Sequence, residues 1–187
     1  MGDGVWRISG HTNSPTTAVI HNVISKPETI ELKEMPAKLL ENRDGKYVDV
    51  SSDYGIEIKE QTSSSAIGDF NNDGWTDLYV ANDYAEPDFM YYNNGDGTFT
   101  NVINNTLKHI SRFSMGTDTG DINNDGFMDL ITLDMAAEDH YRSKTNMSSM
   151  NEDEFNKTVS QGKHYQYMAN TLQVNTGIGT FFDAANM

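Results

Sequence analysis

The sequence contains no cysteine, which excludes disulfide bonds and thiolate metal sites. Basic residues are scarce, because 13 Lys and Arg face 28 Asp and Glu, and the formal charge is −15. A chain of this charge is repelled by phosphate backbones and anionic membrane surfaces, so we expect no nucleic-acid partner.

No run approaches the roughly 18 apolar residues of a membrane span, and we expect no membrane insertion. Met1–Gly10 lacks the basic and apolar regions of a signal peptide. We therefore expect a cytoplasmic protein or a piece of a longer, exported one.

An acidic, glycine-punctuated segment occurs twice, 52 residues apart. GDFNNDGWTDLYV begins at Gly68 and GDINNDGFMDLIT begins at Gly120. The same separation links NRDGKYVDV, from Asn42, to NGDGTFTNV, from Asn94. A third relative of the latter pair, NTGIGTFFDA, begins at Asn175, about 30 residues later than the period predicts. The sequence therefore predicts a repeated structural unit whose last copy carries an insertion.

Each unit contains about four short segments that are rich in β-branched and aromatic residues and separated by Asn, Asp and Gly, which is typical of strands. Four strands in about 40 to 52 residues are typical of a β-propeller blade. We therefore expect an all-β fold, a partial β-propeller of four-stranded blades with calcium loops and one short helical insertion. A β-sandwich is the alternative. The insertion, at about 139–167, has the pattern of a surface helix from about Glu152 to Gln161, with Asn151 as its N-cap.

The repeat divides the chain into four expected parts. Residues 1–35 are an N-terminal segment, either a diverged blade or a sequence outside the repeat. Residues 36–62 are the tail of a blade with its connector, and residues 63–114 are a blade with the first acidic loop and a connector. Residues 115–187 are a blade with the second acidic loop and the helical insertion. Because propellers usually close with four to eight blades, we expect the missing blades to come from the rest of a longer chain.

The two acidic loops have the pattern of calcium sites. Oxygen-bearing side chains stand at loop positions 1, 3, 5 and 9, glycine stands at position 6, and the carbonyl at position 7 is the expected backbone ligand. The expected ligands are Asp69, Asn71, Asp73, Trp75 and Asp77 in the first loop, and Asp121, Asn123, Asp125, Phe127 and Asp129 in the second. Magnesium is the competing ion. The alternative is that these residues are simply turn formers, which is our interpretation of the hairpin turns NRDG, NGDG and NTGIG.

The motifs AIGDFNNDGWTDLYVAND, NNGDGTF, SRFSMGTDTGDINNDGFMDLITLDM and QYMANTLQVNTGIGTF resemble the FG-GAP/VCBS-type repeat proteins. Within these, the chain is similar to the group that contains cartilage acidic protein, whose bacterial members often end in an ASPIC/UnbV domain. The resemblance covers roughly residues 39–187. It implies an exported, calcium-binding β-propeller that recognises other molecules, and it carries the metal ligands onto the Asp and Asn residues named above. An extracellular or cell-surface location follows from the resemblance alone.

No catalytic residues are predicted. The five histidines are scattered, and neither HExxH nor G-x-S-x-G is present. We therefore expect a non-catalytic calcium-binding propeller segment that recognises a protein or a glycan. The alternative is the propeller portion of a secreted enzyme that acts on polysaccharide, in which calcium is structural.

Overall fold

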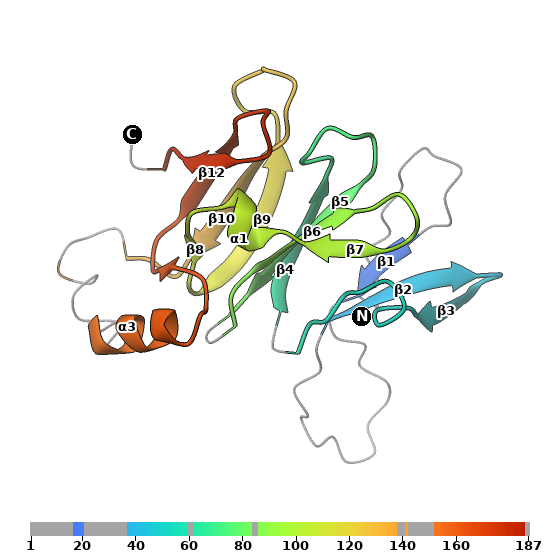
Figure 1. Ribbon diagram of the computed structural model, residues 1–187, viewed down its shortest axis with the longest axis horizontal. Helices are drawn as coiled ribbons and strands as arrows, with labels where there is room; N and C mark the ends of the chain where they lie inside the picture. Colours follow the sequence, from blue (N-terminus) through green and yellow to red (C-terminus); the bar gives the residue numbers. More distant parts are fainter. Residues whose placement is uncertain are drawn as a thin grey trace, which may run out of the picture.

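The computed structural model describes residues 17–20, 37–59, 62–83, 86–137, 141 and 152–185, and it describes residues 17–20 by their backbone alone. Strands dominate these residues and form three antiparallel sheets and one parallel two-stranded pair (Figure 1). The prediction of a mostly β fold is confirmed. The rest of the expected N-terminal segment, residues 1–16 and 21–35, lies outside the described residues.

The first sheet has three strands in the order β1-β2-β3. They are β1 (Thr17–Ile20), β2 (Lys38–Arg43) and β3 (Lys46–Asp49). Strands β2 and β3 form a hairpin through the NRDG turn, which confirms the turn interpretation of this segment. Strand β1 pairs antiparallel with β2, so at least this part of the expected N-terminal segment adds a strand to the repeat-like hairpin.

The second and third sheets each have four antiparallel strands that follow one another in chain order, apart from an interruption in the third sheet. The second sheet contains β4 (Thr62–Gly68), β5 (Asp77–Asn82), β6 (Phe89–Asn93) and β7 (Phe99–Asn101). The third contains β9 (Ser114–Gly120), β10 (Asp129–Asp134), β12 (Thr171–Asn175) and β13 (Phe181–Asp183). The second strands of the two sheets begin at residues 77 and 129, which are 52 apart, and the first strands are separated by the same number. The third strands begin at residues 89 and 171, which are 82 apart. The difference of 30 is the predicted insertion.

The first strand of each four-stranded sheet differs from the expectation. Strand β4 begins at Thr62 and β9 at Ser114, each one residue before its expected unit, and both strands end before the acidic loop. These strands contain several Ser and Gly residues, which have little tendency to form strands by themselves. Pairing with β5 and β10 along almost their whole length makes them extended.

The connection between the two sheets contains elements that the sequence did not predict. A single helical turn, α1 (Ile103–Thr106), precedes the two-residue strand β8 (Ile110–Ser111). Strand β8 pairs in parallel with β11 (Gln166–Tyr167), which belongs to the insertion. The predicted helix of the insertion is confirmed as α3 (Glu152–Ser160). Its expected N-cap, Asn151, lies outside the described residues, as do residues 139–140 and 142–150 of the insertion.

The sheets are stacked face to face, and strand β5 lies in the middle of the stack (Figure 1). Because side chains alternate along a strand, Leu78 and Val80 pack toward the first sheet, whereas Tyr79 and Ala81 pack toward the third. All four side chains are buried. A strand buried on both faces explains why DLYVAN carries apolar residues at consecutive positions rather than in strict alternation.

The first strands of the two four-stranded sheets, β4 and β9, lie next to each other. The Thr119 hydroxyl donates a hydrogen bond to the carbonyl of Ile67 at 2.9 Å, and the backbone N–H of Thr117 donates one to the Ser64 hydroxyl at 3.2 Å. Small side chains on both strands allow this close approach. Within the described residues, no helix is long and apolar enough to cross a membrane.

Candidate metal-binding loops

The first acidic loop folds back on its own first carboxylate. Backbone N–H groups of Asp73 and Gly74 donate to the two Asp69 carboxylate oxygens at 3.0 and 2.8 Å. The bend requires left-handed backbone at Asn72 and Gly74, with φ of 59° and 88°. Glycine takes this conformation without strain, and asparagine does so more readily than most residues.

The third and fifth loop positions are tied to each other. The Asn71 amide donates to one Asp73 carboxylate oxygen at 2.7 Å, and the Trp75 backbone N–H donates to the other at 2.8 Å. Asp69, Asn71 and Asp73 therefore lie together on the inside of the bend. Each carboxylate oxygen accepts one hydrogen bond here, which leaves lone pairs that can bind a cation.

The second acidic loop repeats this arrangement. Asp125 and Gly126 donate to Asp121 at 3.0 and 2.9 Å, and the Asn123 amide donates to Asp125 at 2.7 Å. The Phe127 N–H donates to Asp125 at 2.9 Å. Each distance is within 0.1 Å of its counterpart in the first loop. The two copies of the motif therefore form the same loop.

The aspartates at the ninth position lie differently from the expectation. Asp77 is an expected metal ligand, but its side chain is buried and its oxygens accept hydrogen bonds from the N–H groups of Phe70 and Asn93, both at 2.8 Å. Asp129 is buried in the same way and accepts N–H bonds from Ile122 and Asn175. These aspartates fasten the loop to the third strand of their sheet.

The pKa of Asp77 is raised to about 6, chiefly by burial and also by the charges of Asp73 and Asp69. The two N–H groups that Asp77 accepts oppose this rise. A cation between Asp77 and its acidic neighbours would stabilise the ionised form of this carboxylate.

Within the part of the chain that the structure describes, no three Asp, Glu or His side chains gather closely enough to hold a metal ion by themselves. In each loop the set that lies together is two carboxylates and one amide, at positions 1, 3 and 5. Calcium would complete its coordination with backbone carbonyls, water or a small shift of the ninth-position aspartate. All of these donors are oxygen, which suits calcium or magnesium and disfavours zinc or copper.

The carboxylates at positions 1 and 5 have no basic partner. Among the described residues, no Lys, Arg or His forms an ion pair with Asp69, Asp73, Asp121 or Asp125. The hairpin aspartate Asp96 differs, since its oxygen accepts bonds from the N–H and the hydroxyl of Thr98, and these bonds lower its pKa. Asp96 therefore closes a turn, as the sequence predicted.

Position 7 of each loop has a role that the sequence analysis missed. The ring of Trp75 lies over Gly95 of the β6–β7 hairpin, where an added Cβ would stand 2.7 Å from the indole nitrogen. Phe127 lies over Gly177 of the β12–β13 hairpin, where an added Cβ would stand 2.6 Å from the ring. The aromatic residue and the glycine recur together in both units, at offsets of 52 and 82 residues, and this recurrence was the available signal for the contact.

Residues 69–132 match the family model of the FG-GAP-like repeat. The match begins at the first residue of the first acidic loop and ends in β10, so it contains both loops. None of the curated proteins matches the chain. The match supports the FG-GAP repeat family, while the similarity to cartilage acidic protein and to ASPIC/UnbV-domain proteins stays a prediction.

Proposed function

We propose that this chain is a calcium-binding segment of a β-propeller that recognises a ligand outside the cytoplasm and carries out no chemistry. Each acidic loop would bind one calcium ion through Asp69, Asn71 and Asp73, or through Asp121, Asn123 and Asp125, with the carbonyls of Trp75 and Phe127 and the aspartates Asp77 and Asp129 as further ligands. The observation that carries the proposal is that one oxygen-lined loop occurs twice with the same hydrogen bonds, and that its carboxylates form no ion pair with a described basic residue.

The packing of the second sheet supports a propeller. One face of β5 carries Tyr79 and Ala81, which are 1% and 0% exposed because the third sheet covers them. The equivalent residues of β10, 52 positions later, are Ile131 and Leu133, which are 36% and 50% exposed. In a propeller, a further blade would cover this face as the third sheet covers its neighbour. We propose that the missing blade belongs to the same longer chain.

The first sheet and the neighbouring strands β4 and β9 fit the same proposal. The sheet order β1-β2-β3 resembles the last three strands of each four-stranded sheet, so residues 17–49 would be a diverged blade. The adjacent small-residue strands β4 and β9 would be the innermost strands, where the blades of a propeller approach one another most closely. An extracellular or cell-surface location rests on the family resemblance.

Calcium is the part of the proposal that can be tested most directly. Ions that bind only the folded state stabilise it by about 1.4 kcal/mol per site at tenfold the dissociation constant. We expect the thermal unfolding temperature of the 187-residue chain to rise with calcium, to fall with chelator, and to respond less to magnesium. Calorimetric titration should give two sites. An unfolding temperature that ignores calcium, together with no heat of binding, would refute the metal proposal.

Two variants and a control locate the sites. Asp73→Ala or Asp125→Ala should remove one calcium site each and lower the calcium-dependent part of the unfolding temperature by about half. Asp96→Ala, in the hairpin turn, should leave calcium binding unchanged. Equal loss of calcium in the Asp96 variant would show that the ion binds elsewhere. Turnover of a polysaccharide by the chain would favour the alternative, a polysaccharide-active enzyme.

A further inference from the structure

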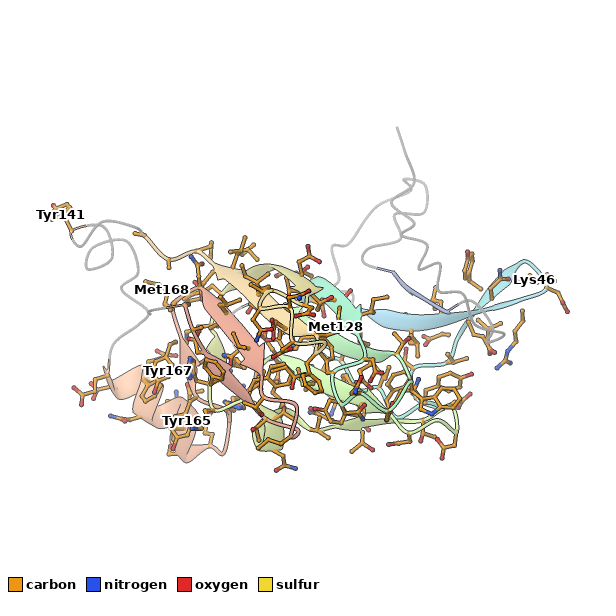
Figure 2. All side chains as sticks on the ribbon, turned by 90° about the horizontal axis from the view of Figure 1, so that it is seen from above. Lys46, Met128, Tyr141, Tyr165, Tyr167 and Met168 are labelled. Atoms are coloured by element: carbon orange, nitrogen blue, oxygen red, sulfur yellow. The ribbon has the colours of Figure 1, made fainter. Side chains whose placement is uncertain are left out.

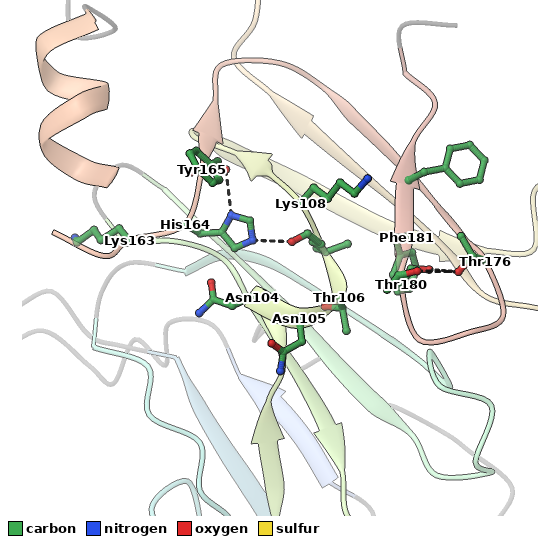
Figure 3. A pocket seen from close by; sticks show the side chains of 12 residues that line it. Asn104, Asn105, Thr106, Lys108, Lys163, His164, Tyr165, Thr176, Thr180 and Phe181 are labelled. Atoms are coloured by element: carbon green, nitrogen blue, oxygen red, sulfur yellow. Dashed lines mark hydrogen bonds between the residues drawn. The ribbon is translucent and has the colours of Figure 1, made fainter. Parts of the chain in front are cut away.

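A cavity of about 580 Å³ opens beside the connection between the two four-stranded sheets (Figure 3). Three segments far apart in the sequence line it: residues 104–108 of α1 and its continuation, residues 163–165 after α3, and residues 176–182 of the β12–β13 hairpin. None of these residues belongs to the acidic loops. The volume is in the range of small-molecule sites, which usually run from about 300 to 1,000 Å³.

The charge of this cavity is opposite to that of the chain. No Asp or Glu lines it, although the chain carries 28 of them, whereas Lys108 and Lys163 do line it. Lys108 is exposed and forms no ion pair with any described residue. The ammonium nitrogen of Lys163 lies 3.6 Å from a carboxylate oxygen of Glu86. The cavity therefore attracts an anionic group into an otherwise acidic surface.

The remaining lining groups suit a ligand with many hydroxyl groups. The side-chain amides of Asn104 and Asn105 are exposed and form no hydrogen bond with described residues, so both their donors and their acceptors are available. The rings of Tyr165 and Phe182 are 49% and 42% exposed at the edge of the cavity. Exposed rings beside amides can bind the apolar face of a sugar ring while the amides bind its hydroxyls.

The walls of the cavity are held in place before any ligand arrives. His164 is buried, and its Nε2 lies 2.9 Å from the carbonyl of Leu107, which joins two of the three segments (Figure 3). Tyr165 contacts Phe155 of α3, with ring centroids 6.2 Å apart, and Figure 2 shows Tyr165 beside this helix. A preformed site loses less conformational entropy on binding.

We infer that this cavity binds an acidic saccharide, with Lys108 and Lys163 on carboxylates of its uronic acid units, Asn104 and Asn105 on its hydroxyls, and Tyr165 and Phe182 against its rings. The inference rests on the proposed recognition function and names the class of its ligand. No bond is made or broken.

The test is a calorimetric titration of the 187-residue chain with two matched tetrasaccharides at constant calcium. One is cellotetraose, and the other is its β-1,4-linked glucuronate counterpart, which differs only in its carboxylates. We expect the uronate to bind about tenfold more tightly at low salt and to lose this preference as salt screens the lysines. Equal affinity for the two sugars, or no binding of the uronate, would overturn the inference.

Variants separate this cavity from a general effect of charge. Lys108→Met and Lys163→Met keep the apolar stem, and each should weaken uronate binding about two- to fivefold, as expected for an exposed ion pair. Lys46→Met is the control, because Lys46 lies on the β2–β3 hairpin at the far end of the molecule from Tyr165 (Figure 2). An equal loss in the Lys46 variant would refute the assignment.

Two further arms separate the possible failures. Inorganic sulfate is the probe for a simple anion site, and binding of sulfate as tight as that of the uronate would overturn the saccharide assignment. The calcium titration tests the proposed function separately. Calcium-dependent unfolding without uronate binding would refute this inference alone, whereas uronate binding without calcium dependence would refute the metal proposal alone.

Discussion

A buried carboxylate between the second and third sheets makes the stability of the protein depend on pH. Asp88 is fully buried and accepts hydrogen bonds from the Tyr79 hydroxyl at 2.5 Å, from the Asn82 N–H at 2.8 Å and from the Ser114 hydroxyl at 3.0 Å. The pKa of Asp88 is raised to about 7, chiefly by burial and also by the nearby charge of Asp134, because the hydrogen bonds it accepts only partly offset these effects. The ordinary value is 3.8.

The sign of the effect follows from proton linkage. Because the folded state holds the Asp88 proton more tightly than the unfolded state, the associated stability is present below pH 3.8 and is lost as the pH rises through about 7. Between pH 5 and pH 8 the loss is roughly 3 kcal/mol, at about 1.4 kcal/mol per unit of pKa difference. For a chain of this size, that corresponds to roughly 6 to 12 °C in unfolding temperature.

The substitution Asp88→Asn tests this reasoning, since asparagine has the same shape and no charge. Its carbonyl can accept from the Asn82 N–H, and its amide can donate to Tyr79 and Ser114 if those hydroxyls turn. We expect the variant to lose less stability than the parent chain between pH 5 and pH 8, by roughly 3 kcal/mol, in urea unfolding at constant calcium. The control is Asp153→Asn, at an exposed position of α3. The same pH dependence in the Asp88 variant and the parent would refute the argument.

Two further substitutions test other contacts. Gly95→Ala should lower the free energy of unfolding in urea by about 1 to 3 kcal/mol, because φ at Gly95 is 76° and the new Cβ would meet Trp75. The control is Gly97→Ala, where φ is 91° but no atom lies within 4 Å of the added Cβ, and it should destabilise the chain less. Equal destabilisation by the two variants would contradict the contact between Trp75 and Gly95. Phe155→Ala should speed amide hydrogen exchange of α3 about tenfold, since the Phe155 ring stacks on Tyr167 with ring centroids 5.4 Å apart. Exchange in β5 should not change to a similar extent. Unchanged exchange in α3 would show that this contact does not hold the helix.

Much of this fold could be predicted from the sequence because its turns, loops and helix depend on residues that are close together in the chain. The DG hairpins and the two acidic loops depend on residues within about ten positions of one another, and left-handed backbone at Gly74 and Gly126 follows from glycine itself. Helix α3 was predictable in the same way, from acidic residues in its first turn and from Phe155 and Val159 four residues apart.

The lengths of strands β4 and β9 were not predictable from local patterns, since Ser- and Gly-containing segments become extended when β5 and β10 pair with them. The burial of Asp77 was hidden for a similar reason. One N–H that it accepts belongs to Asn93, sixteen residues away in the sequence. The sequence therefore showed only an acidic loop residue, whereas in the structure Asp77 is a buried hydrogen-bond acceptor that connects the loop to β6.

The sequence by itself determined the β-rich repeat, the two oxygen-lined loops and the acidic character of the chain, because each follows from composition or from short-range spacing. Only the tertiary structure decided which carboxylates are buried, which sheet face stays exposed at Ile131 and Leu133, and where a cavity opens. The cavity joins residues 104–108 to residues 163–165 and 176–182, where the segment after α3 packs against the neighbouring connection. Contacts between segments so far apart depend on how the sheets stack, and no periodicity in the sequence encodes them.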